Sequence, residues 1–459
     1  MAGIGFELRK IFGKKTLVMN TFGILYSAFT TIGPSLVFIL LLFVLRFLMG
    51  YYHSTELDML FFTEAFTHIF LEASLIAGAV NTILSRYISD CIFAGKEKDI
   101  SASMFGAMMV VDIVSGIISG IYALLLYMVD GKSPVLCMAF YFLSLLATNA
   151  YVLIIFVSAL KEYKQITISY LIGAVLSIGL FWPFYYGLGQ PIVESMFLSL
   201  SIGFFIIDLA MVYCCLKAFG MPGRRYFAFL KGFIKFPALA GSGICYVVGF
   251  YASNIIYWYF SDMQVRAGIF SAAPNYDLAM FLAILINLTG LMIFEIKAET
   301  SFYEKYVLYL SMLEKGNYEQ IERERQNLQN NMNLQLFFVY EVQLIITVLL
   351  ICLIHIIYPY LGISTQVLNL FLILGMAVYC IECMYFTIIF LYYLEDHRGA
   401  LLGPAVCCAL IIAGSILCCF IGMPYYPIPV LAGGIVGWII SFLALRRRVK
   451  NLNEFLFCK

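Results

Sequence analysis

Residues 61–86, FFTEAFTHIFLEASLIAGAVNTILSR, form an apolar run long enough to cross a bilayer as a single helix. Three ionisable residues interrupt it. Glu64, His68 and Glu72 stand four residues apart, so a helix stacks them on one face, a turn apart. An acid at the bilayer centre costs roughly 2.5–3.5 kcal/mol on insertion scales, so such groups face a bundle interior or a wet cavity. We therefore expect this face to line a pathway for a substrate or a cation.

A second interpretation of the same stretch stays open. Glu64 and His68 are near one end of the run, where headgroups and water could solvate them. Glu72 could then serve only to hold a neighbouring helix through an interhelical hydrogen bond.

The rest of the chain has the composition of a polytopic membrane protein. Of its 459 residues, 63% are hydrophobic and 12% are charged, and the mean hydropathy is +0.94. Long apolar runs recur throughout, which indicates an all-α protein of about twelve transmembrane helices rather than a membrane barrel. The spans are expected at 17–47, 60–88, 102–129, 135–160, 166–188, 193–217, 236–260, 277–297, 333–358, 366–394, 400–422 and 428–445.

The basic residues give these spans an orientation. With a cytoplasmic N-terminus, 25 of the 28 Lys and Arg fall on the inner side, and only Arg46, Lys132 and Arg266 fall outside. The positive-inside rule then predicts a multi-pass protein of the cytoplasmic membrane with both termini in the cytoplasm. A miscounted span would invert every later loop, so the split also favours an even number.

The spans group into two halves of six helices around a central cavity. We expect a cytoplasmic amphipathic helix at 1–16, a first half at 17–217, a basic cytoplasmic linker at 218–235, a second half at 236–445 and a basic tail at 446–459. Two parallel repeats of this kind are a known transporter plan with the substrate site between the halves.

The second half carries the longest polar stretch, residues 298–332, which we expect to form a cytoplasmic helical hairpin. Gly316 and Asn317 break the helical pattern, and a charged helix follows with Glu319 and Arg323 at i, i+4. The hairpin is either a docking surface for a cytosolic partner or a solvated connection between spans.

Three more acids lie deep in predicted spans, namely Asp112, Asp208 and Glu382, and no basic residue accompanies them there. Buried acids without buried bases cannot be internal ion pairs, so they must be protonated, hydrated or facing a cation. We add them to the predicted substrate or cation pathway. For each one alone, a protonated carboxyl bonding a neighbouring helix is an equally good account.

Motifs for catalysis, cofactors and metals are missing from the sequence. It contains no phosphate-binding loop, no G-x-S-x-G and no H-E-x-x-H, so we predict no ATP hydrolysis, no catalytic residues, no cofactor and no metal. Cys380 and Cys383 have a metal-type spacing but lack a second pair. A membrane acyltransferase using His355 is the best enzyme alternative, because an isolated His in an apolar span can act as a base.

Five short segments, spread in order along the chain, resemble the PelG family, the membrane transport component of bacterial Pel exopolysaccharide machinery. They are AGIGFELRK at 2–10, SALKEYK at 158–164, YDLAMF at 276–281, ETSFYE at 299–304 and YLEDHRGA at 393–400. The first is the most specific, and the five are spread in order over most of the chain, so the resemblance extends over its full length.

This resemblance implies the twelve-helix fold of the multidrug/oligosaccharidyl-lipid/polysaccharide exporter superfamily and movement of a hexosamine-rich polymer across the cytoplasmic membrane. It also implies a cytosolic glycosyltransferase partner like PelF and membrane subunits like PelD and PelE, with no nucleic-acid partner. It assigns no role to any particular residue. A flippase for a lipid-linked sugar, or a scaffold subunit of the same machinery, remains the alternative function.

Overall fold

The computed structural model describes residues 33–160, 163–295 and 300–453, and nearly all of them are helical. Among these residues, eleven helices are long and apolar enough to cross a membrane. The helix α3 (Gly33–Tyr51) is the described part of the first predicted span. The all-α, many-span fold class is therefore confirmed. The predicted amphipathic helix at 1–16, and residues 17–32 of the first span, lie outside the described residues.

The chain divides into two compact units. We call residues 33–160, 163–247 and 265–272 the N-terminal unit, and residues 248–264, 273–295 and 300–453 the C-terminal unit. The division falls within one helix, α10 (Pro237–Phe260). Residues 265–272, which follow that helix, belong to the N-terminal unit although their flanking segments belong to the other.

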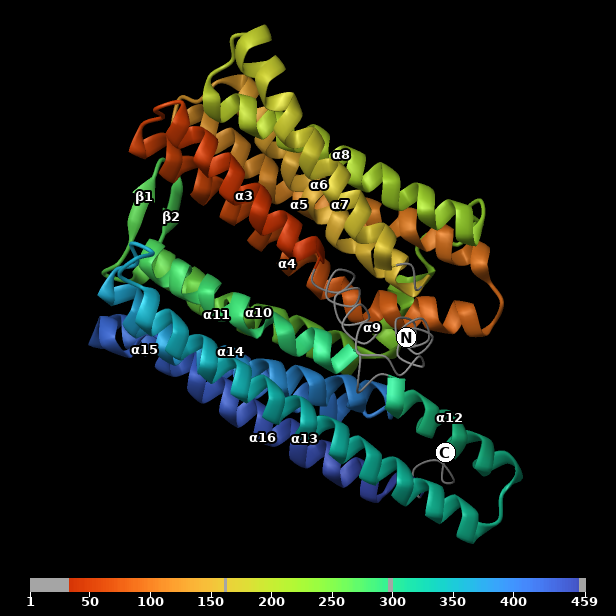
Figure 1. Ribbon diagram of the computed structural model, residues 1–459. Coiled ribbons are helices and arrows are strands. Elements are labelled where there is room, and N and C mark those ends of the chain that lie inside the picture. Colours follow the sequence, from red (N-terminus) through yellow and green to blue (C-terminus); the bar gives the residue numbers. More distant parts are fainter. Residues whose placement is uncertain (1–32, 161–162, 296–299, 454–459) are drawn as a thin grey trace, which may run out of the picture. The chain divides into compact units, whose positions relative to one another are not determined.

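The N-terminal unit is a helical bundle (Figure 1). After α3 it contains α4 (Glu56–Phe93), α5 (Glu97–Met128), α6 (Pro134–Ala159), α7 (Tyr163–Trp182), a π-helical turn η1 (Pro183–Gly187) and α8 (Ile192–Phe219). The helix α6 packs against α4, α5 and α8, which makes it the centre of the bundle. Short helices η2 (Ala228–Leu230) and α9 (Lys231–Lys235) then lead into α10.

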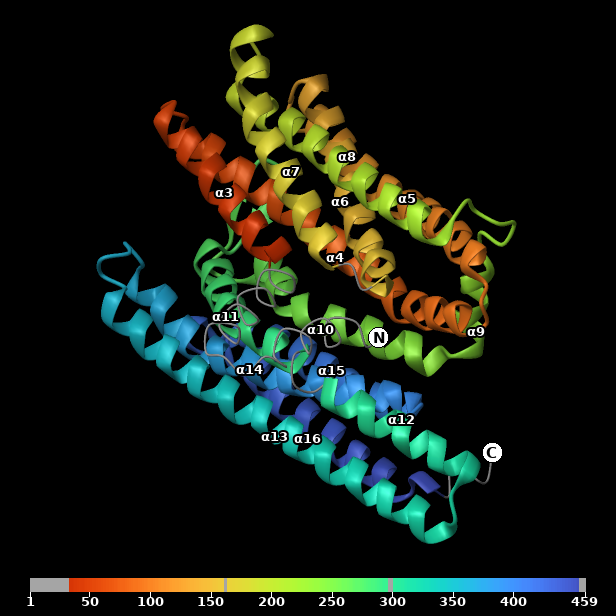
Figure 2. The ribbon, with the colours of Figure 1, turned by 45° about the vertical axis from the view of Figure 1, so that its right-hand side comes forward.

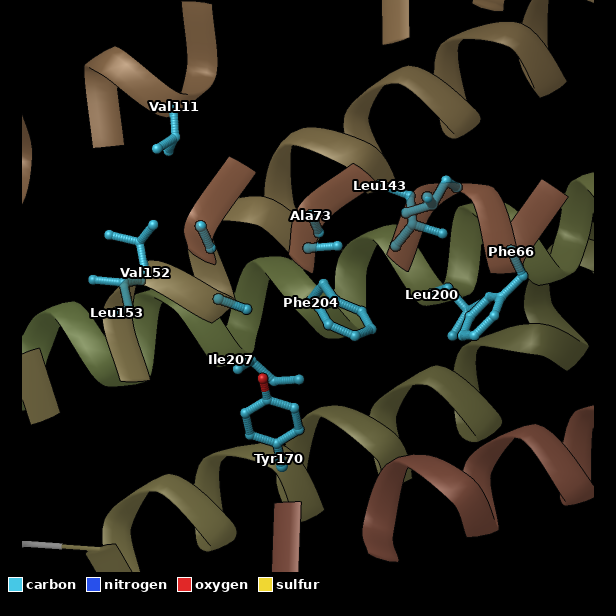
Figure 3. Packing of buried hydrophobic residues seen from close by; sticks show 14 of the residues in the cluster. Phe66, Ala73, Val111, Leu143, Val152, Leu153, Tyr170, Leu200, Phe204 and Ile207 are labelled. Carbon is cyan, nitrogen blue, oxygen red and sulfur yellow. The ribbon is translucent and has the colours of Figure 1, made fainter. Parts of the chain in front are cut away.

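Close packing of apolar side chains holds this bundle together (Figure 3). Phe66 and Ala73 of α4 lie over Leu200 and Phe204 of α8, and all four are almost completely buried. By contrast, α5 turns an apolar face outward, with Ile113, Ile117, Ile121 and Leu124 each more than half exposed. A row of exposed aliphatic side chains of this size is expected where a helix faces lipid.

Residues 265–272 form a two-stranded antiparallel ribbon in the N-terminal unit, which the sequence did not predict. Strand β1 (Val265–Ala267) pairs with β2 (Phe270–Ala272), so that Arg266 lies opposite Ser271. The turn uses Gly268 at a φ of 64°, and the Ile269 amide donates to Asp130 Oδ2 at 2.8 Å. Both strands pack against α4.

The C-terminal unit is built around a buried helix, α14 (Thr365–Tyr393). It packs against α11 (Pro274–Ile293), α13 (Tyr318–Ile357), α15 (His397–Ile421) and α16 (Ile428–Lys450). A short turn, η4 (Met423–Tyr425), joins the last two. The most apolar part of α14 is 78% buried, whereas that of α13 is 22% buried, so α13 lies at the margin of the unit.

A helical hairpin projects from one end of this unit, where α12 (Thr300–Lys315) turns back into α13 (Figure 2). The break falls at Gly316 and Asn317, as the sequence predicted, and Asn317 caps α13 through a capping box with Gln320. The charged helix and the following span are one helix of 40 residues, because neither Gly nor Pro interrupts 318–357.

The ion pair on this hairpin differs from the predicted one. Within the described part of the chain, Arg325 pairs with Glu322 at 2.5 Å, and no pair forms between Glu319 and Arg323. The Arg325 guanidinium lowers the pKa of Glu322 to about 2, so both groups are charged at neutral pH. Arg325 Nη1 also donates to the Val449 carbonyl, which ties the hairpin to the end of α16.

Candidate functional site

The three ionisable residues of α4 lie on one face, as their spacing predicted, and that face is directed into the N-terminal unit. Glu64 is 4% exposed, His68 is 5% exposed and Glu72 is 7% exposed. None of them is solvated at a surface, so headgroup solvation does not account for Glu64 and His68. Their burial also excludes contact with a group as large as a sugar in this conformation.

Glu72 lies at the centre of a hydroxyl cluster. The Ser115 hydroxyl of α5 donates to Glu72 Oε1 at 2.8 Å. The Thr148 hydroxyl of α6 donates to Ser115 Oγ at 3.3 Å, and Ser144 Oγ lies 3.4 Å from the same oxygen. Three helices thus contribute to one polar site, and no basic side chain takes part in the contacts described.

The other end of the acidic face is enclosed by aromatic rings. His68 Nδ1 donates to the Glu64 carbonyl at 2.8 Å, which places the ring proton on Nδ1. Its ring lies 4.9 Å from that of Phe270, which is completely buried. Phe270 in turn stacks on Tyr122 at 5.8 Å. The β-ribbon therefore covers the Glu64 and His68 end of α4.

Asp112 and Asp208 form a second acidic cluster in the same unit. The Asn149 amide donates to Asp112 Oδ1 at 2.8 Å. Asp208, 5% exposed, has no hydrogen-bond partner for either carboxylate oxygen among the described residues. Asp112 and Tyr170 are its neighbours. Figure 3 shows Tyr170 directed toward Ile207, the neighbour of Asp208 on α8.

The structure thus brings together five of the six predicted site residues within one unit. Glu64, Glu72 and Asp208 are buried and Asp112 is half-buried. The donors described for Glu72 and Asp112 are neutral, and the basic residues of α4, α5 and α8 lie toward the helix ends. Such groups are stable in a low-dielectric interior when they carry a proton or a small cation. A cluster of this composition is chemically suited to binding a proton or a small cation.

The sixth predicted residue, Glu382 of α14, lies in the C-terminal unit and is 7% exposed. It borders a separate network of amides and hydroxyls. Gln343 of α13 donates to Asn287 Oδ1 at 3.1 Å and to Thr347 Oγ1 at 3.0 Å. The Thr289 hydroxyl donates to Gln343 Oε1 at 2.8 Å.

Several of these partners were not picked out from the sequence. Ser115 and Ser119 follow Asp112 at helical spacing, so the sequence already places the three on one face of a helix. Gln343 and Thr347 stand four residues apart in an apolar run, which likewise indicates one polar face. His355, the residue of the enzyme alternative, is exposed in the last turn of α13, with its ring 6.2 Å from that of Tyr358.

Known structures share this fold. An outward-facing multidrug resistance MATE family transporter of the MOP superfamily superposes with a TM-score of 0.63, at 12% identity, over 94% of this chain and 96% of that one. A MOP superfamily transporter from Pyrococcus furiosus gives 0.64 at 12% identity, with coverage of 94% and 96%. A MATE transporter from Vibrio cholerae gives 0.62 at 12% identity, with coverage of 98% and 99%.

Sequence comparison identifies the family. A search of curated proteins found no match. The family model described as "PelG: Putative exopolysaccharide Exporter (EPS-E)" matches residues 1–457. The match spans nearly the whole chain, it agrees with the resemblance of the five short segments, and the fold is that of a transporter superfamily. The chain is therefore a multi-pass membrane protein that belongs to the PelG family of putative exopolysaccharide exporters.

Proposed function

We propose that this protein moves a hexosamine-rich exopolysaccharide of the Pel class across the cytoplasmic membrane, as one subunit of a synthase-dependent secretion complex. The family match over residues 1–457 carries this proposal. The transporter fold supports it, although a shared fold by itself does not imply a shared substrate.

The buried acids of the N-terminal unit have a separate part in this proposal. Glu72 and Asp208 are buried and Asp112 is half-buried, so the polymer does not pass over Glu72 or Asp208 in this conformation. We assign them to a proton or small-cation pathway. Loading and unloading of positive charge changes the electrostatic energy of the bundle, and this coupling would favour one conformation of the transporter over another.

The distribution of charge supports the proposed localisation, and the family resemblance supports the proposed partners. The placement of 25 of the 28 Lys and Arg on one side supports a cytoplasmic N- and C-terminus. The α12–α13 hairpin would then lie in the cytoplasm, where it would dock a PelF-like glycosyltransferase, with PelD- and PelE-like subunits beside it in the membrane. Glu319, Arg323 and Gln326 form its exposed polar face.

Export is tested by removing this chain from its own cells. Extracellular hexosamine polymer, measured by a sugar-specific lectin, should fall to background while long polymer accumulates inside. Restoring the chain should restore export. Unchanged extracellular polymer would refute the proposal, and accumulation of short lipid-linked sugars in place of long polymer would identify a flippase.

Partner docking is tested on the exposed face of the hairpin. Replacing Glu319, Arg323 and Gln326 together by Ala leaves the buried contacts of α13 in place, so the protein should remain folded in the membrane. Co-purification of the glycosyltransferase should fall about tenfold or more, as expected when interface contacts worth at least ~1.4 kcal/mol are removed. Tyr360→Ala, at an exposed position beyond α13, is the matched control. Full co-purification with the triple variant would contradict docking at this face.

A further inference from the structure

Glu382 occupies an unusual position in the C-terminal unit. It lies on α14, the most enclosed helix of that unit, and is 7% exposed. Its Oε2 atom is fully buried and has no hydrogen-bond partner in the described part of the chain. A carboxylate in such a place normally accepts two or three hydrogen bonds or faces a cation, because an isolated buried charge is very costly.

The neighbouring polar groups are already bonded to one another. The Gln343 amide donates to Asn287, Thr347 and the Ile286 carbonyl, and the Thr347 hydroxyl also donates to Asn287 Oδ1 at 2.8 Å. The Asn287 amide donates to the Ala283 and Gly375 carbonyls. No donor of this network is left for Glu382. Gln343 Oε1, with one donor from Thr289, keeps a lone pair that can accept another.

Gly290 of α11 lies beside both the Glu382 carboxylate and this network. A Cβ atom at position 290 would lie 2.9 Å from Glu382 Oε2 and 3.2 Å from Gln343 Cδ. The acid and the amide therefore both border the space beside Gly290. A larger residue at 290 would have to displace the end of the Glu382 side chain.

No positive charge compensates this acid. The helix α11 has no Lys or Arg, and neither does α14 or the part of α13 beyond residue 325. The basic residues of α15 and α16 stand in their first and last turns. The titratable side chains in the middle of α13, α14 and α15 include Tyr340, Tyr379, Cys380, Cys383 and Cys407, none of which is basic, and Cys383 interacts with Glu382. Asp277, the acid of α11, is in the first turn.

We propose that Glu382 is a proton-binding site within the C-terminal unit, distinct from the acids of the N-terminal unit. With a proton bound, the carboxyl is neutral and can donate to the free lone pair of Gln343 Oε1. A metal ion is a poorer fit, because no group of three or more His, Cys, Asp or Glu side chains that could hold one occurs among the described residues. The proton leaves only when the unit rearranges to admit water or a donor. The role of this exchange in export rests on the proposed function, but proton binding itself does not.

Infrared spectroscopy of the purified protein in lipid nanodiscs tests the proposal without any transported substrate. The carbonyl stretch of protonated carboxyl groups is recorded at neutral pH for the wild type and for Glu382→Gln. Asp277→Asn is the matched control, since Asp277 accepts from Trp258, Asn254 and the Ala273 amide and should be ionised. The band should lose one component in Glu382→Gln and be unchanged in Asp277→Asn.

Two measurements on the wild type complete the test and need no variant to fold. The Glu382 component should shift on transfer to D₂O and should disappear reversibly as the pH is raised. An identical band in Glu382→Gln would overturn the proposal, because Glu382 would then be ionised. A component that neither shifts in D₂O nor titrates would overturn it too, because the acid would then be a sealed structural hydrogen-bond donor. Either result leaves the export test unaffected.

Discussion

Carboxyl groups of this chain differ mainly in how many donors surround them. Asp277 accepts from the Trp258 indole at 2.8 Å, from Asn254 at 2.7 Å and from the Ala273 amide at 3.1 Å, so three donors stabilise its charge at the start of α11. Glu72 receives a hydroxyl, Asp112 receives one amide, and Asp208 receives nothing within the described residues. The first arrangement stabilises a fixed anion, whereas the others are suited to groups that bind and release positive charge.

Glu72→Gln is the most direct test of the N-terminal acids. Gln keeps the size and the acceptor for Ser115, so the protein should reach the membrane at a normal level. Export should fall strongly, about tenfold or more, because the neutral amide cannot bind a proton or cation. Glu72→Leu should have the same effect and can insert more readily. Extracellular polymer and membrane-fraction immunoblots measure the two quantities.

Glu194→Gln is the control for this prediction. Glu194 is 9% exposed and accepts from the Ser133 hydroxyl at 3.0 Å, so it resembles Glu72 in burial and partner but lies outside the acidic clusters. Its substitution should leave export near normal. If Glu72→Gln exports normally, its charge is not needed, and if that variant is degraded, the acid mainly holds α4 to α5.

The sequence predicted which helix face carries the acids, but it did not predict which side chains surround them. Helical spacing alone placed Glu64, His68 and Glu72 on one face, because the period of an α-helix is fixed. It could not distinguish a cavity wall from the interior of a bundle. That distinction depends on Ser115 and Thr148, which come from two other helices and meet Glu72 only through tertiary packing.

At the scale of elements, the β-ribbon at 265–272 gives a sharp test of packing. Gly268→Ala places a Cβ against the Asp130 carboxylate and forces a non-glycine residue to a φ of 64°. We expect the ribbon to detach from α4, at a cost above the roughly 1–2 kcal/mol of a left-handed residue alone. Trypsin should then cleave faster after Arg266, which is exposed in β1.

Gly131→Ala is the matched control, because Gly131 has a φ of 60° but a Cβ there would meet nothing within 4 Å. The Gly131→Ala variant has the same backbone strain, but its new Cβ does not collide with another atom. Cleavage after Arg266 should stay at the wild-type rate in this variant. Equal cleavage of the two variants would show that strain, rather than the contact with Asp130, governs the ribbon.

Long helices were easier to predict from the sequence than short strands, because a long apolar run is easier to recognise. Spans of twenty or more residues stand out by hydropathy, and α4, α6 and α14 match their predicted ranges to within a few residues. The ribbon was missed, because strands of three residues are too short to show alternation. Its position depends on Phe270 entering an aromatic group made by α4, α5 and α6.

At the scale of the whole molecule, the fold is shared with MATE transporters at only 12% identity. A bilayer permits few ways to satisfy backbone polar groups, so the arrangement of spans can persist while most side chains change. Superposition on these structures therefore assigns no role to the acids of this chain. Their roles have to be argued from their own contacts, as for Glu72 and Glu382.

The orientation of the whole chain is the last prediction. Residues 264 and 319 are separated by one span, α11, so they should lie on opposite sides of the membrane. The distribution of Lys and Arg places 319 inside and 264 outside. In a cysteine-depleted background, an impermeant thiol reagent applied to intact cells should label Gln264→Cys and leave Glu319→Cys unlabelled until the membrane is permeabilised.

The reverse pattern would invert the topology, and the hairpin could then no longer meet a cytosolic glycosyltransferase. Labelling of both positions in intact cells would mean that α11 does not separate them, and the even number of spans would be wrong.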